Sequence, residues 1–303
     1  DLLAPRPVCR VLEPTGLLNH CHEWQECLGC RPSLASDFPF GHYDLVIEPY
    51  TGRLPARIEV PTSCRTRLGI SEHQWTRDGF RGIHEIDENI RVVARETGIE
   101  AREEDRWPEL HLTADEKAFA RDLLRQYKLN GPLVGIHAGS GRRQSWKRWP
   151  PQMFVELMRR LTEGKGAHMA VFGGPDDVET NSYILRSSDN RVLDFPRIGP
   201  FRHTAAVIAR CDVFVSNDSG LMHAANAVGV PLVAIFGPTS PQKSRPLGKD
   251  SRLKILTPNE RCQCCYVEDA KKPARCSHRQ CLFSIRPGDV LDAVEDLLER
   301  RNI

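Results

Sequence analysis

The chain has 303 residues, of which 40% are hydrophobic and 27% charged. This composition is typical of a folded globular protein and argues against a disordered one, and the length allows two domains. The 42 basic and 40 acidic side chains are scattered along the chain, so composition gives no case for a nucleic-acid-binding protein. No apolar stretch reaches the ~20 residues of a membrane-spanning helix, and the first residues lack the pattern of a secretory signal. We therefore expect a cytoplasmic protein.

The first part of the chain, residues 1–112, shows few clear elements. Residues 43–47 and 56–60 are of strand length and composition, and the rest is rich in Pro, Arg and Cys. We expect a small or incomplete α/β domain here. A capping box, Thr113 to Glu116, then predicts a helix over residues 113–130 that ends near Gly131. We expect this helix to connect two domains.

From residue 131 to 303, short apolar runs alternate with helical patterns. The runs at 133–137, 168–172, 213–216, 232–236 and 253–256 are largely apolar, as in strands buried on both faces. Between the first two, apolar residues at 154, 157, 158 and 161 repeat at the helical period. This alternation predicts a doubly wound α/β domain, whose ligands bind beyond the carboxyl ends of the strands.

A polar turn follows the apolar strand that begins at Val213. Gly220 removes a side chain where a ligand must approach the backbone, and the N–H groups that open the next helix suit a diphosphate. His223 lies near the first turn of that helix. The alternative is that Asn217 to Gly220 only cap the helix, as these residue types commonly do.

Two further strand ends carry similar turns. Ser140 lies in a Gly-Ser-Gly turn followed by basic residues, where backbone amides and a cation such as Lys147 can hold a phosphate. Arg142 and Arg143 are interpreted as solvated side chains. In the third turn, residues 173–177, Asp176 or Asp177 is a candidate acceptor for a ribose hydroxyl, and an ordinary turn is the alternative.

These segments resemble glycosyltransferase family 9, the heptosyltransferases. The family signature D-S-G-x-x-H-x-A-x-A…P…F-G-P-T is similar to a run of this chain: Asp218, Ser219, Gly220, His223, Ala225, Ala227, Pro231 and residues 236–239. The family also carries a basic residue before a Trp-Pro pair, as Lys147 stands before Trp149 and Pro150, and an F-G-G-x-x-[DE] element like residues 172–177. The resemblance covers residues 131–303.

The resemblance implies a GT-B type α/β fold with two Rossmann-like domains, at 1–112 and 131–303, and an ADP-heptose donor. It implies sugar transfer to a hydroxyl of lipopolysaccharide core or of a protein, with Lys147 stabilising the leaving phosphate. The donor contacts it implies are Ser140, Lys147, Asp176, Asp218, Ser219, Gly220, Leu221 and His223. The family's general base is an Asp after the first strand. Only Asp1 faintly resembles it, so the base stays unassigned, and whether a segment precedes Asp1 is left open.

Clustered cysteines between residues 262 and 281 predict a metal site. Cys262, Cys265, Cys276 and Cys281 have the paired spacing of a four-cysteine site, and thiolates suit iron or zinc. Cys264 is spare in this interpretation, His278 is a substitute ligand, and free thiols are the alternative. One branch of the resembled family, which modifies autotransporter proteins, has an iron-binding cysteine finger.

Two further classes of function stay open. One is an enzyme of the same fold that uses another nucleotide sugar. The other is an inactive relative whose cysteine finger binds a partner protein, since the expected base is missing. The sequence does not decide the acceptor, a peripheral location at the inner membrane, or homo-oligomer formation.

Overall fold

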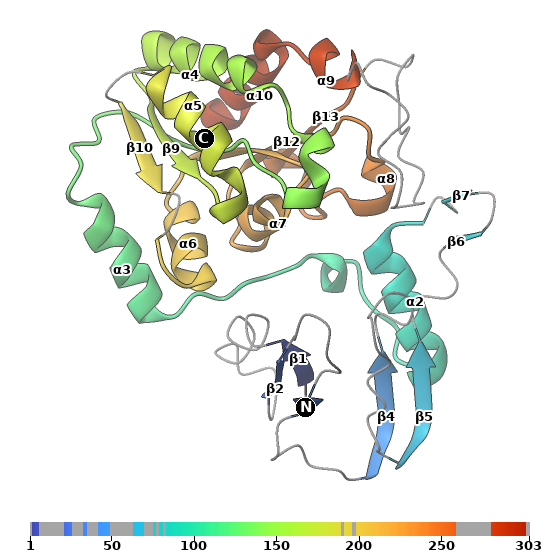
Figure 1. The fold of residues 1–303 in the computed structure, drawn as a ribbon. Coiled ribbons are helices and arrows are strands. Elements are labelled where there is room, and N and C mark those ends of the chain that lie inside the picture. The colour runs from blue at the N-terminus through green and yellow to red at the C-terminus, as the bar shows by residue number, and fades with distance from the viewer. Residues whose placement is uncertain are drawn as a thin grey trace. The chain divides into compact units, whose positions relative to one another are not determined.

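A computed structural model of the chain describes residues 83–188, 191–195, 198–258 and 280–300 and, before residue 83, the backbone of several short strands. The chain divides into two compact units, Asp1–Arg102 and Glu103–Ile303, which we describe separately (Figure 1). The boundaries expected at residues 112 and 130 remain predictions. Throughout the described ranges, no helix combines the length and apolar character needed to cross a membrane.

The described part of the first unit consists of short strands and the helix α2. The strands are β1 (Leu2–Pro5), β2 (Cys21–Gln25), β3 (Ser33–Leu34), β4 (His42–Glu48), β5 (Ser63–Gly69), β6 (Trp75–Thr76) and β7 (Gly79–Phe80). The strand expected at 43–47 is confirmed as β4, which pairs in parallel with β5, whereas 56–60 lies outside the described residues. Helix α2 (Glu85–Thr97) begins at His84, whose Nδ1 accepts from the Ile86 N–H, and ends at Gly98 in the left-handed region.

The second unit is built on one parallel sheet in the order β10-β9-β8-β11-β12-β13. Its strands are β8 (Leu133–His137), β9 (His168–Phe172), β10 (Val192–Phe195), β11 (Val213–Asn217), β12 (Leu232–Ile235) and β13 (Leu253–Leu256). The order reverses between β8 and β11, which is the topology of a doubly wound Rossmann-like domain. The α/β prediction for this half is confirmed.

Strand β10 is absent from the sequence prediction. It is an edge strand in which Asp194 is exposed while Leu193 and Phe195 are buried, so it contains no continuous apolar run. Strands β8, β9, β11 and β12 are buried at every residue, as their continuous apolar runs predict, whereas β13, at the other edge, is half-buried throughout.

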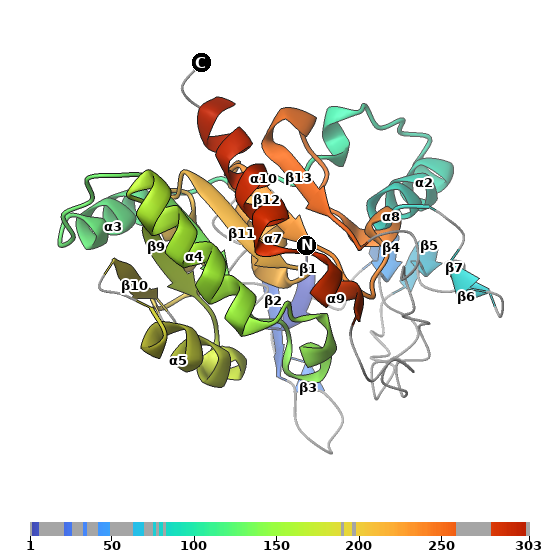
Figure 2. The ribbon, with the colours of Figure 1, turned by 90° about the horizontal axis from the view of Figure 1, so that it is seen from above.

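Helices cover both faces of this sheet (Figures 1 and 2). The apolar clusters place α4 (Pro151–Lys165), α5 (Val178–Arg186), α9 (Gln280–Ser284) and α10 (Pro287–Arg300) on one face. They place α3 (Ala114–Leu124), α6 (Phe201–Ile208) and α7 (Gly220–Ala227) on the other. Short elements complete the unit: η2 (Glu104–Arg106), η3 (Arg142–Lys147), η4 (Pro175–Asp177), α8 (Pro241–Ser244) and η5 (Asp250–Arg252).

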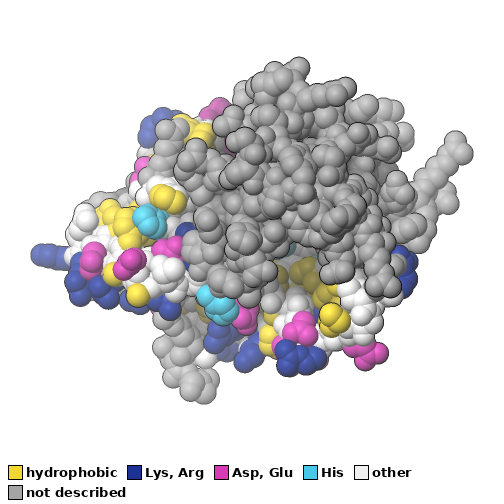
Figure 3. Space-filling model, turned by 90° about the horizontal axis from the view of Figure 1, so that it is seen from below, with side chains coloured by type: hydrophobic (Ala, Val, Ile, Leu, Met, Phe, Trp, Pro, Cys, Tyr) yellow, Lys and Arg dark blue, Asp and Glu magenta, His cyan; other side chains and the backbone are white. Residues whose placement is uncertain are grey.

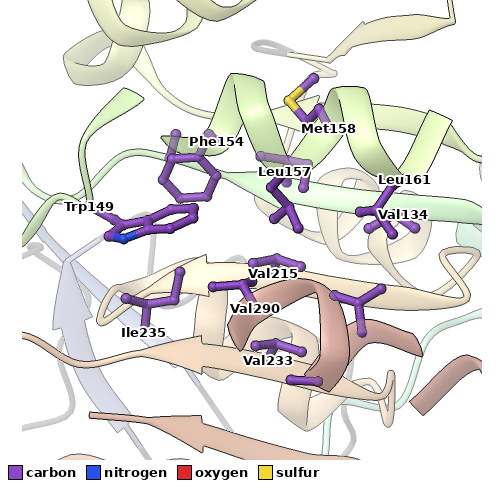
Figure 4. Close-up of a cluster of buried hydrophobic side chains, with 14 of the residues drawn as sticks. Val134, Trp149, Phe154, Leu157, Met158, Leu161, Val215, Val233, Ile235 and Val290 are labelled. Carbon is purple, nitrogen blue, oxygen red and sulfur yellow. The ribbon is translucent and has the colours of Figure 1, made fainter. Parts of the chain in front are cut away.

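The packing of α4 fixes the segment that leads out of the loop after β8. Trp149, just before α4, is fully buried, and its ring meets Phe154 edge to face at 4.8 Å (Figure 4). The indole N–H donates to the Ile285 carbonyl at 3.0 Å, so the ring is buried without an unpaired donor. Each such buried side chain stabilises the fold by roughly 1.5–3 kcal/mol. The residues just before Trp149 are therefore attached to a rigid core.

The predicted capping box at the start of α3 is present. Thr113 Oγ1 accepts from the Glu116 N–H at 3.2 Å, and the Glu116 carboxylate accepts from the Thr113 N–H at 2.8 Å. The helix ends at Leu124 rather than near 130, and its apolar side packs against α6. The buried Arg202 of α6 donates to Glu116 at 3.0 Å, so α3 is part of the second unit's core.

Candidate functional site

The site residues expected from the sequence gather at the switch point of the parallel sheet. Strands β8 and β11 are neighbours, and the chain leaves their carboxyl ends in opposite directions. In open parallel sheets this position forms the crevice in which ligands bind. The loop after β8 carries Ser140 and Lys147, and the loop after β11 carries Asp218, Ser219 and Gly220. Two distant parts of the sequence therefore meet at one crevice.

Lys147 and Asp218 join these two loops through an ion pair. The Lys147 Nζ lies 2.8 Å from the Asp218 Oδ2, and the two side chains are only 13% and 7% exposed. Among the described residues that oxygen accepts no hydrogen bond, so the contact is an ion pair without a directed hydrogen bond. The ammonium also lies 5.6 Å from the centre of the Trp146 ring, within range of a cation–π contact. A concentrated positive charge thus stands at the crevice, balanced by one carboxylate.

The N-terminus of α7 opens toward free space at Gly220. Ser219 is the N-cap, and its Oγ accepts from the Met222 N–H at 3.4 Å. A Cβ atom placed on Gly220 would meet no atom within 4 Å, and Gly220 is exposed. Main-chain N–H groups and the helix dipole make such an end favourable for an anion. Leu221 and His223 follow in the same helix and are half-buried.

Ser140, a predicted donor contact, is buried, and its hydroxyl is already hydrogen-bonded within the chain. The residue is 3% exposed, and its Oγ donates to the Gln144 carbonyl at 2.8 Å. The same oxygen accepts from the Arg148 Nε at 3.1 Å. The hydroxyl therefore holds the turn together, and it must change partners before it can donate to a phosphate.

Asp177 forms a buried charged network below the crevice, while Asp176 is exposed. Asp177 Oδ1 lies 3.1 Å from the Arg148 Nη2, and Oδ2 accepts from the Gly174 N–H at 3.0 Å and lies 3.4 Å from the His137 Nε2. Burial alone would raise the pKa of Asp177, but these hydrogen bonds and charges outweigh it and lower the pKa. Because both oxygens have protein partners, Asp177 is poorly placed to accept from a ribose, and Asp176 remains the predicted contact.

A glycine is required where Asp177 meets the loop after β8. A Cβ atom on Gly139 would lie 2.1 Å from Asp177 Oδ1, closer than any real contact. Only the absent side chain lets the carboxylate approach, and it then accepts from the Ser140 N–H at 3.3 Å. The loop after β8 and the loop after β9 are thereby held together.

Sequence reasoning missed three residues that assemble this site: His137, Arg148 and Asn217. The Asn217 Nδ2 donates to the carbonyls of Ala138 and Gly139, and its Oδ1 accepts from the Trp149 N–H. Arg148 donates to Ser140 and to Asp177. The polar identity of His137 and Asn217 at the ends of apolar strands was the available signal.

The predicted cysteine site lies largely outside the described residues. Cys262, Cys265 and Cys276 fall in the undescribed segment between 258 and 280, as do Cys264 and His278. Cys281 lies in α9 and is 2% exposed within the apolar cluster. In the parts of the chain that the structure describes, no three His, Cys, Asp or Glu side chains are grouped as metal ligands.

The model of glycosyltransferase family 9 (heptosyltransferase) matches residues 55–274 of this chain. The lipopolysaccharide heptosyltransferase 2 of Escherichia coli (strain K12) is 32% identical over 199 residues, which are 63% of this chain and 54% of that protein. The chain thus spans about half the length of this curated relative.

Solved structures share the fold. The structure of E. coli ADP-heptose lps heptosyltransferase II matches with a TM-score of 0.53 and 26% identity, over 65% of this chain and 55% of that one. The iron-containing dodecameric glycosyltransferase TibC of enterotoxigenic E. coli H10407 matches with a TM-score of 0.55 and 17% identity, over 80% of this chain and 61% of that one. These matches confirm the GT-B type fold assignment. With the family model covering most of the chain, the conclusion is that this chain belongs to glycosyltransferase family 9, the heptosyltransferases.

Proposed function

We propose that this protein transfers heptose from ADP-heptose to a hydroxyl group of lipopolysaccharide core, in the cytoplasm. The observation that carries the proposal is the Lys147–Asp218 pair beside the open N-terminus of α7, at the switch point of the sheet. A nucleoside diphosphate needs a cation and oriented N–H groups, and both stand there. The family relationship and the names of the relatives supply the sugar and the acceptor.

In the proposed reaction an acceptor oxygen attacks the anomeric carbon, and the bond to the diphosphate breaks. Negative charge then grows on the departing ADP. Lys147 and the main-chain N–H groups at Gly220 and Leu221 face that charge and stabilise the transition state. Asp218 is released from Lys147 when the diphosphate arrives, which makes its carboxylate available as an acceptor for sugar hydroxyls. The group that removes the acceptor proton stays unassigned.

Nucleotide preference tests the proposal directly. Calorimetry with ADP, UDP and GDP should show binding that favours ADP, and incubation with ADP-heptose and lipopolysaccharide core should release ADP. The same assay with a protein acceptor separates the two acceptor classes. Preference for UDP or GDP would leave the fold assignment unchanged but would reject the heptosyltransferase function. Binding of ADP without turnover on any acceptor would favour an inactive relative.

A metal at Cys262, Cys265, Cys276 and Cys281 is a second part of the proposal. It rests on the cysteine spacing, and TibC, which has the same fold, is described as iron-containing. When bound, iron or zinc would fold the polar segment that precedes α9. The same relative is described as dodecameric, so size-exclusion chromatography with light scattering should test for a homo-oligomer.

A further inference from the structure

His137, the last residue of β8, lies between two of the strand-end loops. It is 4% exposed, and its two ring nitrogens face different partners. The Nε2 lies 3.4 Å from Asp177 Oδ2, in the loop after β9, and the Nδ1 lies 2.9 Å from Ser219 Oγ, the N-cap of α7. One imidazole therefore links three chain segments that are far apart in the sequence.

The partners of the ring determine where its proton lies. Asp177 Oδ1 accepts from the Arg148 Nη2 at 3.1 Å and Oδ2 accepts from the Gly174 N–H at 3.0 Å, as an ionised carboxylate does, and an ionised carboxylate can only accept. The Nε2 of His137 must then carry a proton, and in the neutral ring this leaves a lone pair on Nδ1. Ser216, 3.3 Å from Nδ1, uses its own proton on the Asn217 carbonyl at 2.8 Å. The Ser219 Oγ lies 3.1 Å from the Ser216 Oγ and 2.9 Å from Nδ1, so we assign its proton to Nδ1, the nearer acceptor.

We propose that His137 is a positioning residue of the donor site: held by Asp177, it accepts the Ser219 hydroxyl proton and locks the N-terminus of α7. The inference rests on the proposed function and deepens it. The Ser219 proton is turned away from the crevice, so the diphosphate is held by the main-chain N–H groups of the first turn of α7 rather than by this hydroxyl. Ser219 then acts as a cap that pre-organises these donors.

Two substitutions of His137 separate its two contacts. In His137→Asn the side-chain oxygen can take the place of Nδ1 and accept from Ser219, but the contact with Asp177 is lost. In His137→Gln the amide nitrogen can take the place of Nε2 and donate to Asp177, but the acceptor for Ser219 is lost. We expect ADP affinity to fall about three- to tenfold in His137→Gln, the loss of one net hydrogen bond, and to fall less in His137→Asn. Equal losses or the reverse order would overturn the proposal.

A double-mutant cycle shows whether the effect passes through Ser219. In Ser219→Ala the hydroxyl is already absent, so adding His137→Gln should weaken ADP binding little further. Additive losses in the double variant would mean that His137 acts by another route. Thermal melts of all four proteins separate a binding effect from unfolding.

The tautomer of His137 gives a readout that a purely packing role does not predict. Nitrogen NMR of the labelled wild-type chain at neutral pH should show His137 with a protonated Nε2 and an unprotonated Nδ1. A protonated Nδ1 would overturn the proposal even if every variant fails to fold. If the wild type binds no ADP, the proposed function fails, while the tautomer still decides the proton assignment.

Discussion

The Lys147 Nζ and the Asp218 Oδ2 are 2.8 Å apart, with both side chains almost fully buried. Each charge is removed from water, so each depends on the other for compensation. A diphosphate can replace the carboxylate as the partner of Lys147, because it is also anionic and the N-terminus of α7 lies beside it. The pair therefore holds the site in a charge-balanced state before the donor binds.

Removal of the Lys147 charge should weaken nucleotide binding. In Lys147→Ala the loss of a charge-assisted contact should reduce ADP affinity by ~1.5–3 kcal/mol in calorimetry. Lys117→Ala removes the same charge from an exposed position in α3 and serves as the matched control. Equal affinity in Lys147→Ala and the wild type would show that Lys147 does not contact the diphosphate.

A second substitution, at Asp218, should restore the stability of the Lys147→Ala variant but not its affinity for ADP. The single variant leaves Asp218 buried and unpaired, which lowers the free energy of unfolding. Lys147→Ala combined with Asp218→Asn removes both charges, so its urea unfolding midpoint should return toward the wild-type value. Its ADP affinity should stay low. Recovery of both properties together would contradict a direct role of Lys147 in binding.

Two glycines of one turn should respond differently to alanine. Gly139→Ala places a methyl group 2.1 Å from the Asp177 carboxylate, whereas Gly141→Ala meets nothing within 4 Å. We expect Gly139→Ala to lower the free energy of unfolding by about 1–3 kcal/mol and Gly141→Ala to change it little. Urea unfolding measures both, and similar effects in the two variants would refute the assigned contact.

Asp177 should contribute acid-sensitive stability. Its pKa is lower in the folded chain than the ordinary value of about 3.9, so its contribution is complete above that value and is lost as pH falls through the folded pKa. Asp177→Asn should therefore be less stable than the wild type at pH 7, and the difference should shrink below about pH 4. Asp176→Asn, at an exposed position, is the control. A constant difference across pH would argue against the ionised network.

Removing only one partner of the Arg202–Glu116 ion pair, which joins α3 and α6, should destabilise the fold strongly. Arg202 and Glu116 are 4% and 8% exposed, and Arg202 also donates to the His111 carbonyl. Arg202→Met leaves the buried Glu116 carboxylate without its cation and should lower the free energy of unfolding by roughly 3–5 kcal/mol. Adding Glu116→Gln should recover part of this loss. No recovery in the double variant would place the loss in packing rather than charge.

The cysteine segment should contain metal. Protein purified without added metal should hold close to one equivalent of iron or zinc, and chelation should lower the thermal midpoint, because thiolate binding is coupled to folding. Cys262→Ser should lose the metal. Cys211→Ser, at a buried position outside the cysteine segment, should retain it. Less than about a tenth of an equivalent of both metals together would reject the site.

Much of the second unit follows from local sequence. Strands buried on both faces leave continuous apolar runs, and β8, β9, β11 and β12 lie at the predicted runs for that reason. The half-buried edge strand β13 was also predicted, because three of its four residues are apolar. The capping box of α3 is equally local, since its two hydrogen bonds join residues three positions apart. The edge strand β10 was missed because one side of it faces solvent.

The candidate site shows what local sequence leaves open. Residue types and the family resemblance were enough to name Lys147, Asp218, Ser219 and Gly220, because phosphate sites need a cation, glycine and a helix start. Their pairing depends on β8 and β11 becoming neighbours, and no local pattern encodes that adjacency. The roles of His137, Arg148 and Asp177 depend on contacts between separate loops. Sequence alone therefore determined the strand runs and which residue types stand at the strand ends, and tertiary structure decided which side chains meet and hold one another there, because burial and partner geometry arise only when distant strands pack together.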